Sequence, residues 1–441
     1  MSARSVALDV IIEVAERDAY ANLLLPKRVA AASLSSADAA LATELTYGTL
    51  RWQGQYDSVI RQLSSRDVSN LDSDVAAALR LGMHQLARTR IADHAAVHET
   101  VDLLGRNARG KRGFVNALLR KCVDGGYAAV LNTILAEAEG DEAIALEHAH
   151  PSWIIRAFRR ALAAEAHEDE LLRLLEANNT AAAVQLVALP GLATASELGG
   201  STTVSPIGTS LDRGDPAAHP LVKTGRARVQ DAGSQLAALA LVEAQRVQRG
   251  ERWLDMCAGP GGKAALLAAS AEVHGVELIA NEVQPHRAKL VQRATERFGT
   301  RVVTGDGRRF AEEPEAFDRV IVDAPCTGLG ALRRRPESRW RKRASDIATL
   351  SALQEELLAA AVKTTKSGGI VAYVTCSPHL AETQQIVQRA VRSGEVEAIE
   401  TGPIMERIAP GIAECSRGTA AQLWPHRHGT DAMFVQLLRK L

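Results

Sequence analysis

Apolar residues in the first third of the chain follow the spacing of amphipathic α-helices. Val6, Val10 and Val14 repeat at four-residue intervals, which places them on one face of a helix. Alternation of apolar and polar residues, the pattern of half-buried strands, is scarce here. Pairs such as Gly125-Gly126 are typical of breaks between helices. These patterns predict a compact all-α domain over residues 1–144.

The pattern changes in the second half of the chain, where short β-branched runs alternate with helical stretches. Such alternation is typical of a parallel sheet with helices on its faces. The helical stretches include residues 285–298 and 351–366, and we expect Gly368-Gly369 to end the second of them. We therefore predict an α/β Rossmann-like domain over residues 226–441. Its expected strands are residues 252–257, 277–283, 301–304, 317–322, 370–374 and 432–437.

Residues 145–225 carry mixed signals. A helix is expected up to Ala177, and residues 183–188 form a candidate strand that ends before Pro190-Gly191. Gly, Ser and Thr are frequent over residues 194–216, which is typical of loops. We predict a small α+β connecting domain here.

The composition, with 46% apolar and 24% charged residues in a chain of 441, indicates an ordinary globular protein. No apolar run is long enough to span a bilayer, and the N-terminus leads into an amphipathic helix and not a signal peptide. We therefore expect a cytoplasmic protein, and a monomer. Five cysteines without a CxxC pair favour neither a disulfide framework nor a zinc site, so no metal is expected.

The 52 basic and 52 acidic residues cancel, so only local patches could indicate a nucleic-acid partner. One basic segment lies within residues 106–121, and in another, residues 333–343, seven of eleven residues are basic. Both could contact phosphates, and a base could stack on Trp340. The alternative is that both are solvated faces. The candidate RNA-contacting residues are Arg109, Lys111, Arg112, Arg333, Arg334, Arg335, Arg339, Trp340 and Arg341.

Three of the five cysteines lie at the ends of apolar, β-branched runs. Cys326 ends the run that begins at Val320, Cys376 ends the run that begins at Val371, and Cys257 ends a third. The carboxyl ends of parallel strands meet at the edge of the sheet where ligands bind. We therefore expect Cys326 and Cys376 to face one pocket. The alternative, a small buried apolar residue, is weaker for two cysteines than for one.

A glycine-rich loop lies between the first expected strand of this domain and a helix. Its glycines allow a tight turn and a close approach of the backbone to a ligand, which the amide groups at the helix start would face. The loop matches neither GxGxxG nor a P-loop, so a smaller adenosine ligand such as S-adenosyl-L-methionine fits better. The alternative is a plain turn. The candidate cofactor residues are Cys257, Ala258, Gly259, Pro260, Gly261, Gly262 and Lys263.

Acidic residues follow the next strands of the same domain. Glu282 lies at the end of the second strand, where an acid can bind ribose hydroxyls. Asp306, after the third strand, is placed to reach an adenine, although it could also be a simple turn aspartate. Asp323, after the fourth strand, could hydrogen-bond the edge of a base.

The two cysteines suggest chemistry on a pyrimidine. A thiolate is a side-chain nucleophile that can add to C6 of cytosine, and this addition makes C5 nucleophilic enough to accept a methyl group from a sulfonium. The C5 proton must then leave and the thiol must be eliminated. One cysteine could attack and the other could assist release. A free thiol is only slightly ionised at neutral pH, so the site must supply positive charge or amide dipoles.

Taken together, the motifs CAGPGGK, DAPCTGLGALRRRPESRW and TCS, with the tail LWPHRHGTDAMFVQLL, resemble the RNA cytosine-C5 methyltransferases of the Sun/RsmB type (the NOL1/NOP2/Sun family). The N-terminal motifs LTYGTLRW and FVNALLRK resemble the NusB-like RNA-binding domain of the RsmB branch. The resemblance covers nearly the whole chain.

The resemblance implies a role for each site residue. Cys376 matches the nucleophile, Cys326 the residue that helps product release, and Asp323 the acid that contacts the cytosine. The glycine-rich loop, Glu282 and Asp306 match the residues that bind S-adenosylmethionine. The implied substrate is 16S ribosomal RNA, with the target base extruded from its stack. Two departures are a glycine at 259, where alanine is common, and a glutamate at 282, where aspartate is commoner.

Two alternatives stay open. A transfer RNA cytosine-C5 methyltransferase would use the same chemistry, and the NusB-like domain favours ribosomal RNA by analogy only. A non-catalytic RNA-binding or antitermination-type factor would be expected to lack Cys376 or the glycine-rich loop, and both are present. An amino-group methyltransferase is disfavoured by Asp323-Ala-Pro-Cys326.

Overall fold

The chain folds into two compact units in a computed structural model that describes residues 1–17, 19–105, 107–212 and 214–441. The helical unit comprises residues 1–156 together with 332–342. The α/β unit comprises residues 157–331 and 343–441. The chain therefore passes between the units three times, after residues 156, 331 and 342.

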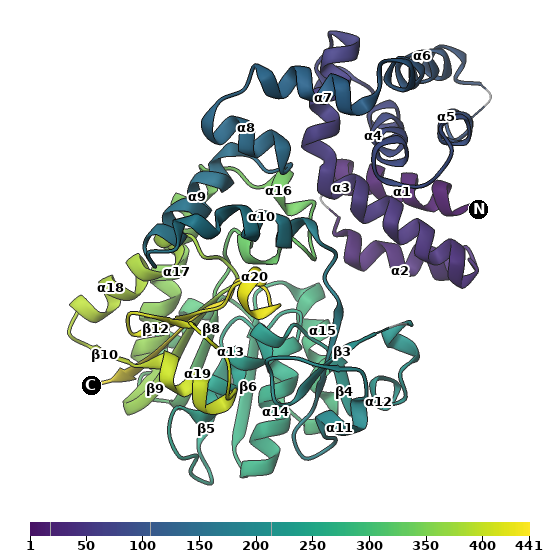
Figure 1. Cartoon of the computed structure of the whole chain (residues 1–441). Helices are drawn as coiled ribbons and strands as arrows, with labels where there is room; N and C mark the ends of the chain where they lie inside the picture. The colour runs from purple at the N-terminus through teal and green to yellow at the C-terminus, as the bar shows by residue number, and fades with distance from the viewer. Residues whose placement is uncertain (18, 106, 213) are drawn as a thin grey trace. The chain divides into compact units, whose positions relative to one another are not determined.

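The N-terminal part is all-α, as its hydrophobic spacing predicts. The valines at positions 6, 10 and 14 are buried in α1, where they pack with residues of α3 and α4 in one apolar core. The α3 helix begins after Ser35, whose hydroxyl accepts a hydrogen bond from the Asp38 amide. The helices of this part, coloured purple to blue in Figure 1, are α1 (Ala3–Arg17), α2 (Ala21–Ala31), α3 (Ser36–Ser64), α4 (Ser73–Arg88), α5 (Asp93–Asp102), α6 (Arg109–Gly125), α7 (Tyr127–Ala136) and α8 (Gly140–Glu147), with the short turn η1 (Val68–Asn70).

The basic segment that follows Cys326 is part of the helical unit and contains α16 (Ser338–Arg341). The Trp340 indole N–H donates to the Leu50 carbonyl at 2.8 Å. The Arg339 side chain is fully buried and donates to the carbonyls of Arg51 and Ala149, both at 3.1 Å. Arg341 donates to the Val14 carbonyl at 2.6 Å. These contacts use donors of Arg339, Trp340 and Arg341 to satisfy backbone carbonyls, and a contact of these residues with RNA stays a prediction.

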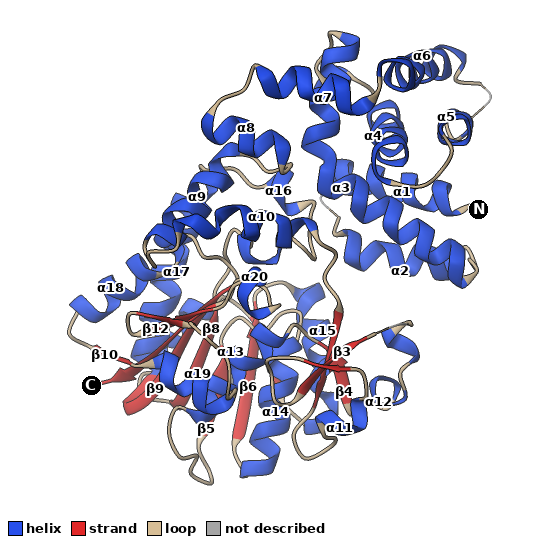
Figure 2. Ribbon diagram, viewed as in Figure 1, coloured by secondary structure: helices blue, strands red, loops and turns tan. Residues whose placement is uncertain are grey.

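The α/β unit is built on a mixed sheet of nine strands, counted over the described residues. The order is β11-β12-β13-β9-β8-β5-β6-β7, and β10 pairs with β13. Figure 2 shows the strands of the sheet in red. Neighbours from β9 to β7 are parallel, and β13 is antiparallel to β9. The strands are β5 (Arg252–Asp255), β6 (Glu277–Glu282), β7 (Arg301–Thr304), β8 (Phe317–Asp323), β9 (Thr365–Thr375), β10 (Val396–Ile399), β11 (Ser416–Arg417), β12 (Ala420–Gln422) and β13 (Phe434–Lys440).

Helices cover both faces of this sheet, which explains why its central strands are apolar on both sides. One face packs on α13 (Ala232–Glu243), α14 (Gly262–His274) and α19 (Thr401–Ile408). The other packs on α17 (Asp346–Thr364) and α18 (Gln384–Arg392). Successive residues Val320, Ile321 and Val322 alternate between the two cores. The chain places β6 and β7 on one side of β5, and β8 and β9 on its other side. The direction in which successive strands are added therefore reverses between β5 and β8, and ligands bind at this position in such folds.

A second, antiparallel sheet precedes the large one. Over the described residues it contains four strands in the order β2-β3-β1-β4, namely β2 (Ser201–Thr202), β3 (Gly208–Leu211), β1 (Val184–Ala188) and β4 (Ala227–Val229). Short helices, α11 (Ala195–Leu198) and α12 (Pro220–Lys223), lie between them. The region is α+β, and its last strand, β4, lies beyond residue 225, the predicted end of the region. The helix expected up to Ala177 is two helices, α9 (Ser152–Ala163) and α10 (Leu171–Asn179).

Gly368-Gly369 does not end the α17 helix, which stops at Thr364. Both glycines lie inside β9 instead. A Cβ at Gly369 would lie 2.7 Å from the Asp318 carbonyl oxygen, and Gly368 has a φ of +77°. The pair therefore allows the irregular, close approach of β9 to β8 near Phe317, which is where the register between these strands shifts.

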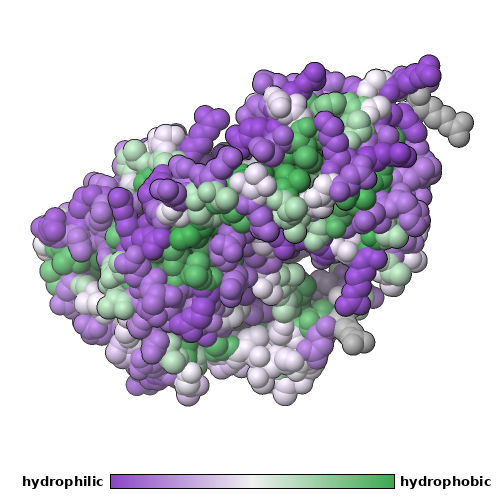
Figure 3. Space-filling view, turned by 45° about the horizontal axis from the view of Figure 1, so that its top comes forward, coloured by the Kyte–Doolittle hydropathy of each residue, from purple (hydrophilic) through white to green (hydrophobic). Residues whose placement is uncertain are grey.

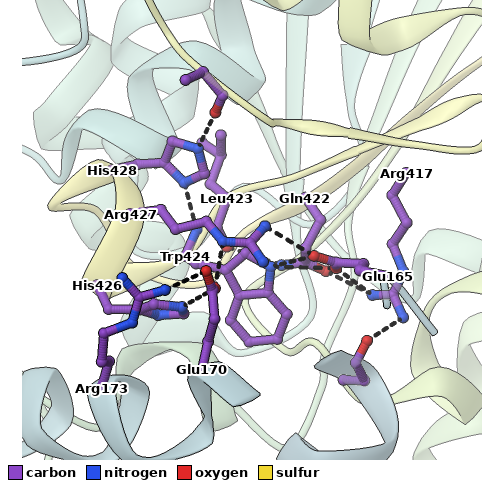
Figure 4. A network of polar contacts seen from close by, with 12 residues as sticks. Glu165, Glu170, Arg173, Arg417, Gln422, Leu423, Trp424, His426, Arg427 and His428 are labelled. Atoms are coloured by element: carbon purple, nitrogen blue, oxygen red, sulfur yellow. Dashed lines mark hydrogen bonds and ion pairs between the residues drawn. The ribbon is translucent and has the colours of Figure 1, made fainter. Parts of the chain in front are cut away.

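The motif LWPHRHGTD holds the C-terminal strands to α10 and the chain before it through a buried network (Figure 4). Glu165 accepts hydrogen bonds from the Trp424 indole at 3.0 Å and from Arg427 at 3.1 Å. Glu170 accepts from Arg427 at 2.6 Å and contacts His426 at 2.8 Å. The carboxylates and cations are nearly all shielded from solvent, so each needs the other to offset its desolvation. The motif is thus structural in this fold.

One face of the molecule is mostly polar. Hydrophilic side chains spread over most of the face drawn in Figure 3, and apolar side chains show between them in smaller patches. Among the described residues, none of the helices combines the length and the apolar composition that crossing a membrane requires.

The position of Trp340 yields a first prediction. We expect Trp340→Ala to destabilise the helical unit by about 2–4 kcal/mol, because it removes a partly buried ring that packs on Gly54 and a hydrogen bond to Leu50. Trp340→Phe should cost less, about 1–2 kcal/mol, because a phenyl ring keeps part of the packing although the N–H and the rest of the indole are lost. Thermal unfolding of the full chain measures both. Arg343→Ala, at an exposed position in the same segment, is the control. An unchanged unfolding midpoint for Trp340→Ala would contradict the packing role of this residue and favour its contact with RNA.

Candidate active site

Two free thiols meet at the carboxyl ends of β8 and β9. The strands are adjacent and parallel, with Asp323 paired to Val374. Cys326 and Cys376 therefore leave the sheet at the same edge, and their sulfur atoms are 3.5 Å apart. Both side chains are partly exposed. The structure thus brings the two cysteines together as the sequence pattern predicts, while Cys122 and Cys415 are buried in hydrophobic cores.

A charged pair lies beside the thiols. Lys263, in the first turn of α14, donates to the Asp323 carboxylate at 2.9 Å. Burial alone lowers the pKa of Lys263, but the charge and hydrogen bond of Asp323 outweigh burial and raise it overall. The charge of Cys376 contributes in the same direction. Lys263 is therefore a cation at neutral pH, and it lies where its charge favours an anionic Cys376.

A third acid stands behind this pair. Asp255, the last residue of β5, is fully buried. Burial, reinforced by the charge of Asp323, raises the pKa of Asp255 to about 8. Asp255 is therefore largely protonated at pH 7, and Asp323 remains the carboxylate that pairs with Lys263. Nothing in the sequence pattern singled out Asp255, although it lies two residues before the glycine-rich loop.

The two facing cysteines differ in their surroundings. The hydrogen bond with Cys376, then burial, then the charges of Cys376 and Glu382 raise the pKa of Cys326 well above its usual value. Cys326 therefore keeps its proton at neutral pH and can donate its S–H to the Cys376 sulfur. Burial and the charge of Asp255 likewise raise the pKa of Cys257. Cys257 is therefore a protonated, poorly reactive thiol.

The glycine-rich loop ends at the start of α14. Gly261, with a φ of +106°, precedes the first residue of the helix, and a Cβ there would lie 2.7 Å from the Ala294 Cβ. Only glycine fits this left-handed position against α15 (Pro285–Thr295). The turn leaves the first amides of α14 without partners inside the helix, so they can face a polar ligand.

Glu282 and Gly259 occupy one small space. Glu282, at the end of β6, is buried, and its carboxylate accepts the Gln284 amide at 2.9 Å. The Arg287 side chain lies 3.6 Å from the other carboxylate oxygen and donates to the Gly259 carbonyl at 2.5 Å. A Cβ at Gly259 would lie 1.9 Å from the Glu282 carboxylate oxygen. The two departures from the family pattern are therefore sterically coupled, because the longer acid fills the place of an alanine methyl.

Asp306 has a local structural partner. Its carboxylate accepts the Arg308 amide at 3.0 Å and caps the turn η5 (Gly307–Glu312). It also pairs with the Arg308 guanidinium at 2.5 Å, which lowers the pKa of Asp306. The neighbouring Asn281, which the sequence did not single out, donates to the Met256 and Gly305 carbonyls at 3.0 and 3.1 Å. Asn281 thereby ties the loops after β5 and β7 together.

The candidate RNA-contacting residues do not form one exposed cluster. In α6, Lys111 pairs with Asp72 and Asp74, both at 2.9 Å, and Arg112 pairs with Asp102 at 2.5 Å. Arg109 is exposed, and Arg106, which also belongs to this basic segment, lies outside the described residues. Arg333, Arg334 and Arg335 are partly buried in the helical unit.

The Gly259–Glu282 coupling gives a second prediction. We expect Gly259→Ala to destabilise the protein by about 1–3 kcal/mol through overpacking. Glu282→Asp in the same chain should recover at least half of the loss, because it shortens the acid that the new methyl would meet. Thermal unfolding of the two single variants and the double variant measures the coupling. Gly262→Ala is the matched control, since its Cβ would meet nothing closer than 3.9 Å. Additive effects would contradict the coupling.

Comparisons with known proteins agree with this geometry. A family described as 16S rRNA methyltransferase RsmB/F matches residues 242–439, and the NusB family matches residues 1–124. The chain is 46% identical over 447 residues to the Mycobacterium tuberculosis protein Rv1407, which is named as a methyltransferase, with 100% of this chain and 96% of that protein covered. It is 32% identical over 418 residues to the ribosomal RNA small subunit methyltransferase B of Escherichia coli (strain 536), with 90% and 92% covered.

A solved structure shows the same fold along the whole chain. PH0851 superimposes with a TM-score of 0.81 at 22% identity, covering 100% of this chain and 99% of that one. The helical N-terminal domain and the mixed sheet are thus found together in another protein. With these matches and the paired strand-end cysteines, the chain belongs to the RsmB/F family of 16S rRNA methyltransferases and carries a NusB-family domain at its N-terminus.

Proposed function

We propose that this protein methylates C5 of a cytosine in 16S ribosomal RNA through a covalent adduct between Cys376 and C6 of the base. The observation that carries the proposal is the 3.5 Å approach of Cys326 and Cys376 beside the Lys263–Asp323 pair. Family membership supports the methyl transfer, and the name of the Escherichia coli relative supports ribosomal RNA of the small subunit as the substrate.

The residues after β5 and β6 fit S-adenosylmethionine as the methyl donor. Gly259 and Gly261 keep the loop free of Cβ atoms where backbone and side chains already crowd, and the start of α14 offers free amides. Glu282 holds a buried carboxylate at the strand end where ribose hydroxyls are bound in related folds. When bound, S-adenosylmethionine supplies an electrophilic methyl group.

The first step uses the charge of Lys263. A thiolate at Cys376 forms a bond to C6, and the electrons of the C5–C6 double bond move to C5. Lys263 favours the attacking anion, while Asp323, held by Lys263, accepts a hydrogen bond from the polar edge of the base. C5 then takes the methyl group and becomes tetrahedral, so one proton has to leave C5 before the double bond can return.

Release is assigned to Cys326. Its hydrogen bond with Cys376 is the largest cause of its raised pKa. Bonding of Cys376 to the base removes a thiolate acceptor, so Cys326 then loses its proton to solvent more easily. The resulting thiolate takes the C5 proton, the bond from Cys376 to C6 breaks, and the double bond re-forms. One proton is released overall for each methyl group transferred.

Methyl transfer to RNA tests the reaction and the two roles. We expect wild-type protein to move labelled methyl from S-adenosylmethionine to one cytosine of an unmodified 16S rRNA transcript. Cys376→Ala should lose at least about 10³-fold in rate, because no nucleophile remains. Cys326→Ala should accumulate a denaturant-stable protein–RNA adduct, because release is blocked.

The outcomes separate the alternatives. An adduct with Cys376→Ala instead would reverse the two roles. Labelling of transfer RNA but not of 16S rRNA would leave the chemistry standing and replace the substrate. Absence of transfer to any RNA while S-adenosylmethionine binds would overturn the catalytic proposal and favour a non-catalytic RNA-binding role.

The pKa of Cys326 gives a prediction that needs no RNA. Because Cys326 has a raised pKa, its alkylation by iodoacetamide should stay slow at neutral pH and accelerate only at alkaline pH. Cys376→Ala removes the largest cause, so the midpoint of the Cys326 profile should move to lower pH. Peptide mass spectrometry follows each cysteine. Cys415, whose pKa burial raises to about 11, is an internal control that should not change. An unmoved Cys326 profile would refute the coupling.

A further inference from the structure

A buried carboxylate touches the loops of both reactive cysteines. Glu382 ends the short turn η7 (Leu380–Glu382) and is fully shielded from solvent. One of its oxygens accepts the backbone amide of Thr327 at 2.7 Å, and the other accepts the Thr327 hydroxyl at 2.5 Å and the Ser377 hydroxyl at 2.6 Å. Thr327 directly follows Cys326, and Ser377 directly follows Cys376. The carboxylate thus accepts hydrogen bonds from the residue after each cysteine.

The surrounding contacts fix this carboxylate in turn. The side-chain amide of Gln354, on α17, donates to Glu382 at 3.3 Å and to the Pro325 carbonyl at 2.8 Å. The hydroxyls of Thr327 and Ser377 are 3.1 Å apart. The Tyr373 hydroxyl donates to the Glu382 backbone carbonyl at 2.8 Å. Glu382 therefore cannot move without breaking contacts to β9, α17 and both cysteine loops.

The chemistry of the donors explains why an acid stands here. The two carboxylate oxygens together receive four hydrogen bonds, and hydrogen bonds to a charged acceptor are shorter and stronger than neutral ones. An aspartate would be one methylene too short to reach both loops at once. An alanine would leave the buried Thr327 amide and both hydroxyls to find other partners. Glu382 also contributes negative charge close to Cys326, which helps that thiol to keep its proton.

We propose that Glu382 is a positioning residue that sets the separation of Cys326 and Cys376 by holding the residue after each of them. This role rests on the proposed function only for its effect on methyl transfer, because the separation of the sulfur atoms is itself measurable. Strand pairing brings the two loops to the same edge, and the carboxylate then fixes the loops beyond the last paired residues, Asp323 and Val374.

A reagent that bridges two thiols tests the separation without RNA or cofactor. Phenylarsine oxide forms two sulfur–arsenic bonds and releases water, so its uptake at this site requires two thiols close together. We expect wild-type protein to take up one equivalent across Cys326 and Cys376. The bridging rate should fall about tenfold or more in Glu382→Ala and less in Glu382→Gln, which keeps the length of the side chain and can still bond both loops.

Milder variants keep the test informative if Glu382→Ala fails to fold. Ser377→Ala removes one of the two links and should slow bridging several-fold. Ser351→Ala is the matched control, because Ser351 donates to the Ala381 carbonyl at 3.2 Å and so supports the same turn without touching either cysteine loop. If Ser351→Ala and Ser377→Ala bridge equally fast, at the wild-type rate, while only thermal stability falls, the positioning role is wrong.

Methyl transfer then separates the two proposals. In Glu382→Gln and Ser377→Ala we expect kcat to fall while KM for the RNA changes little, because the thiols and not the RNA-binding surface are disturbed. If the variants bridge more slowly than the wild-type protein, but the wild-type protein itself transfers no methyl group, the positioning role stands and the proposed reaction is rejected. Equal loss of kcat with unchanged bridging would reject the positioning role and keep the reaction.

Discussion

The parallel pairing of β8 with β9 is the constraint on which the site depends. Both strands are apolar on both faces because helices cover the sheet on both sides, and their register pairs Asp323 with Val374. Neighbouring strands lie about 4.8 Å apart, so the loops that leave two adjacent strands just past their last paired residues start close together. Two cysteines that are fifty positions apart in sequence thereby come within 3.5 Å. Neither loop alone could make this site.

The same edge of the sheet arranges charge in an order that matters for chemistry. Going from β5 to β9, it carries a protonated acid at 255, a carboxylate at 323 that pairs with Lys263, a protonated thiol at 326 and a thiol at 376 near the lysine. Asp255 and Asp323 are neighbouring acids, and ionising both would cost free energy because their charges repel. The more deeply buried Asp255 therefore keeps its proton. Lys263 therefore pairs with the Asp323 carboxylate alone, and its positive charge can also favour the thiolate of Cys376.

How much the sequence could predict depends on whether a signal is local. The β-branched runs ending at Cys326 and Cys376 report burial on both faces of a strand, so the fold class and the meeting of the cysteines could be read from them. Glu382 could not be read, because its role arises from hydrogen bonds to Thr327 and Gln354, whose distance in sequence carries no pattern. Gly368-Gly369 resembled a helix end, because glycine also serves wherever two strands approach closely.

The basic segment 333–343 shows the limit of charge as a signal. A guanidinium is as good a donor to a carbonyl as to a phosphate, and the sequence does not show which acceptor is near. Here the carbonyls of residues 50, 51 and 149 are the acceptors for Trp340 and Arg339. Because these carbonyls belong to the helical unit, that unit is completed by a segment encoded about 180 residues after its last preceding residue, 156. The match to the NusB family ends at residue 124, whereas the helical unit extends to residue 156 and also includes residues 332–342. The stability of the helical unit is therefore tied to a stretch that begins six residues after Cys326.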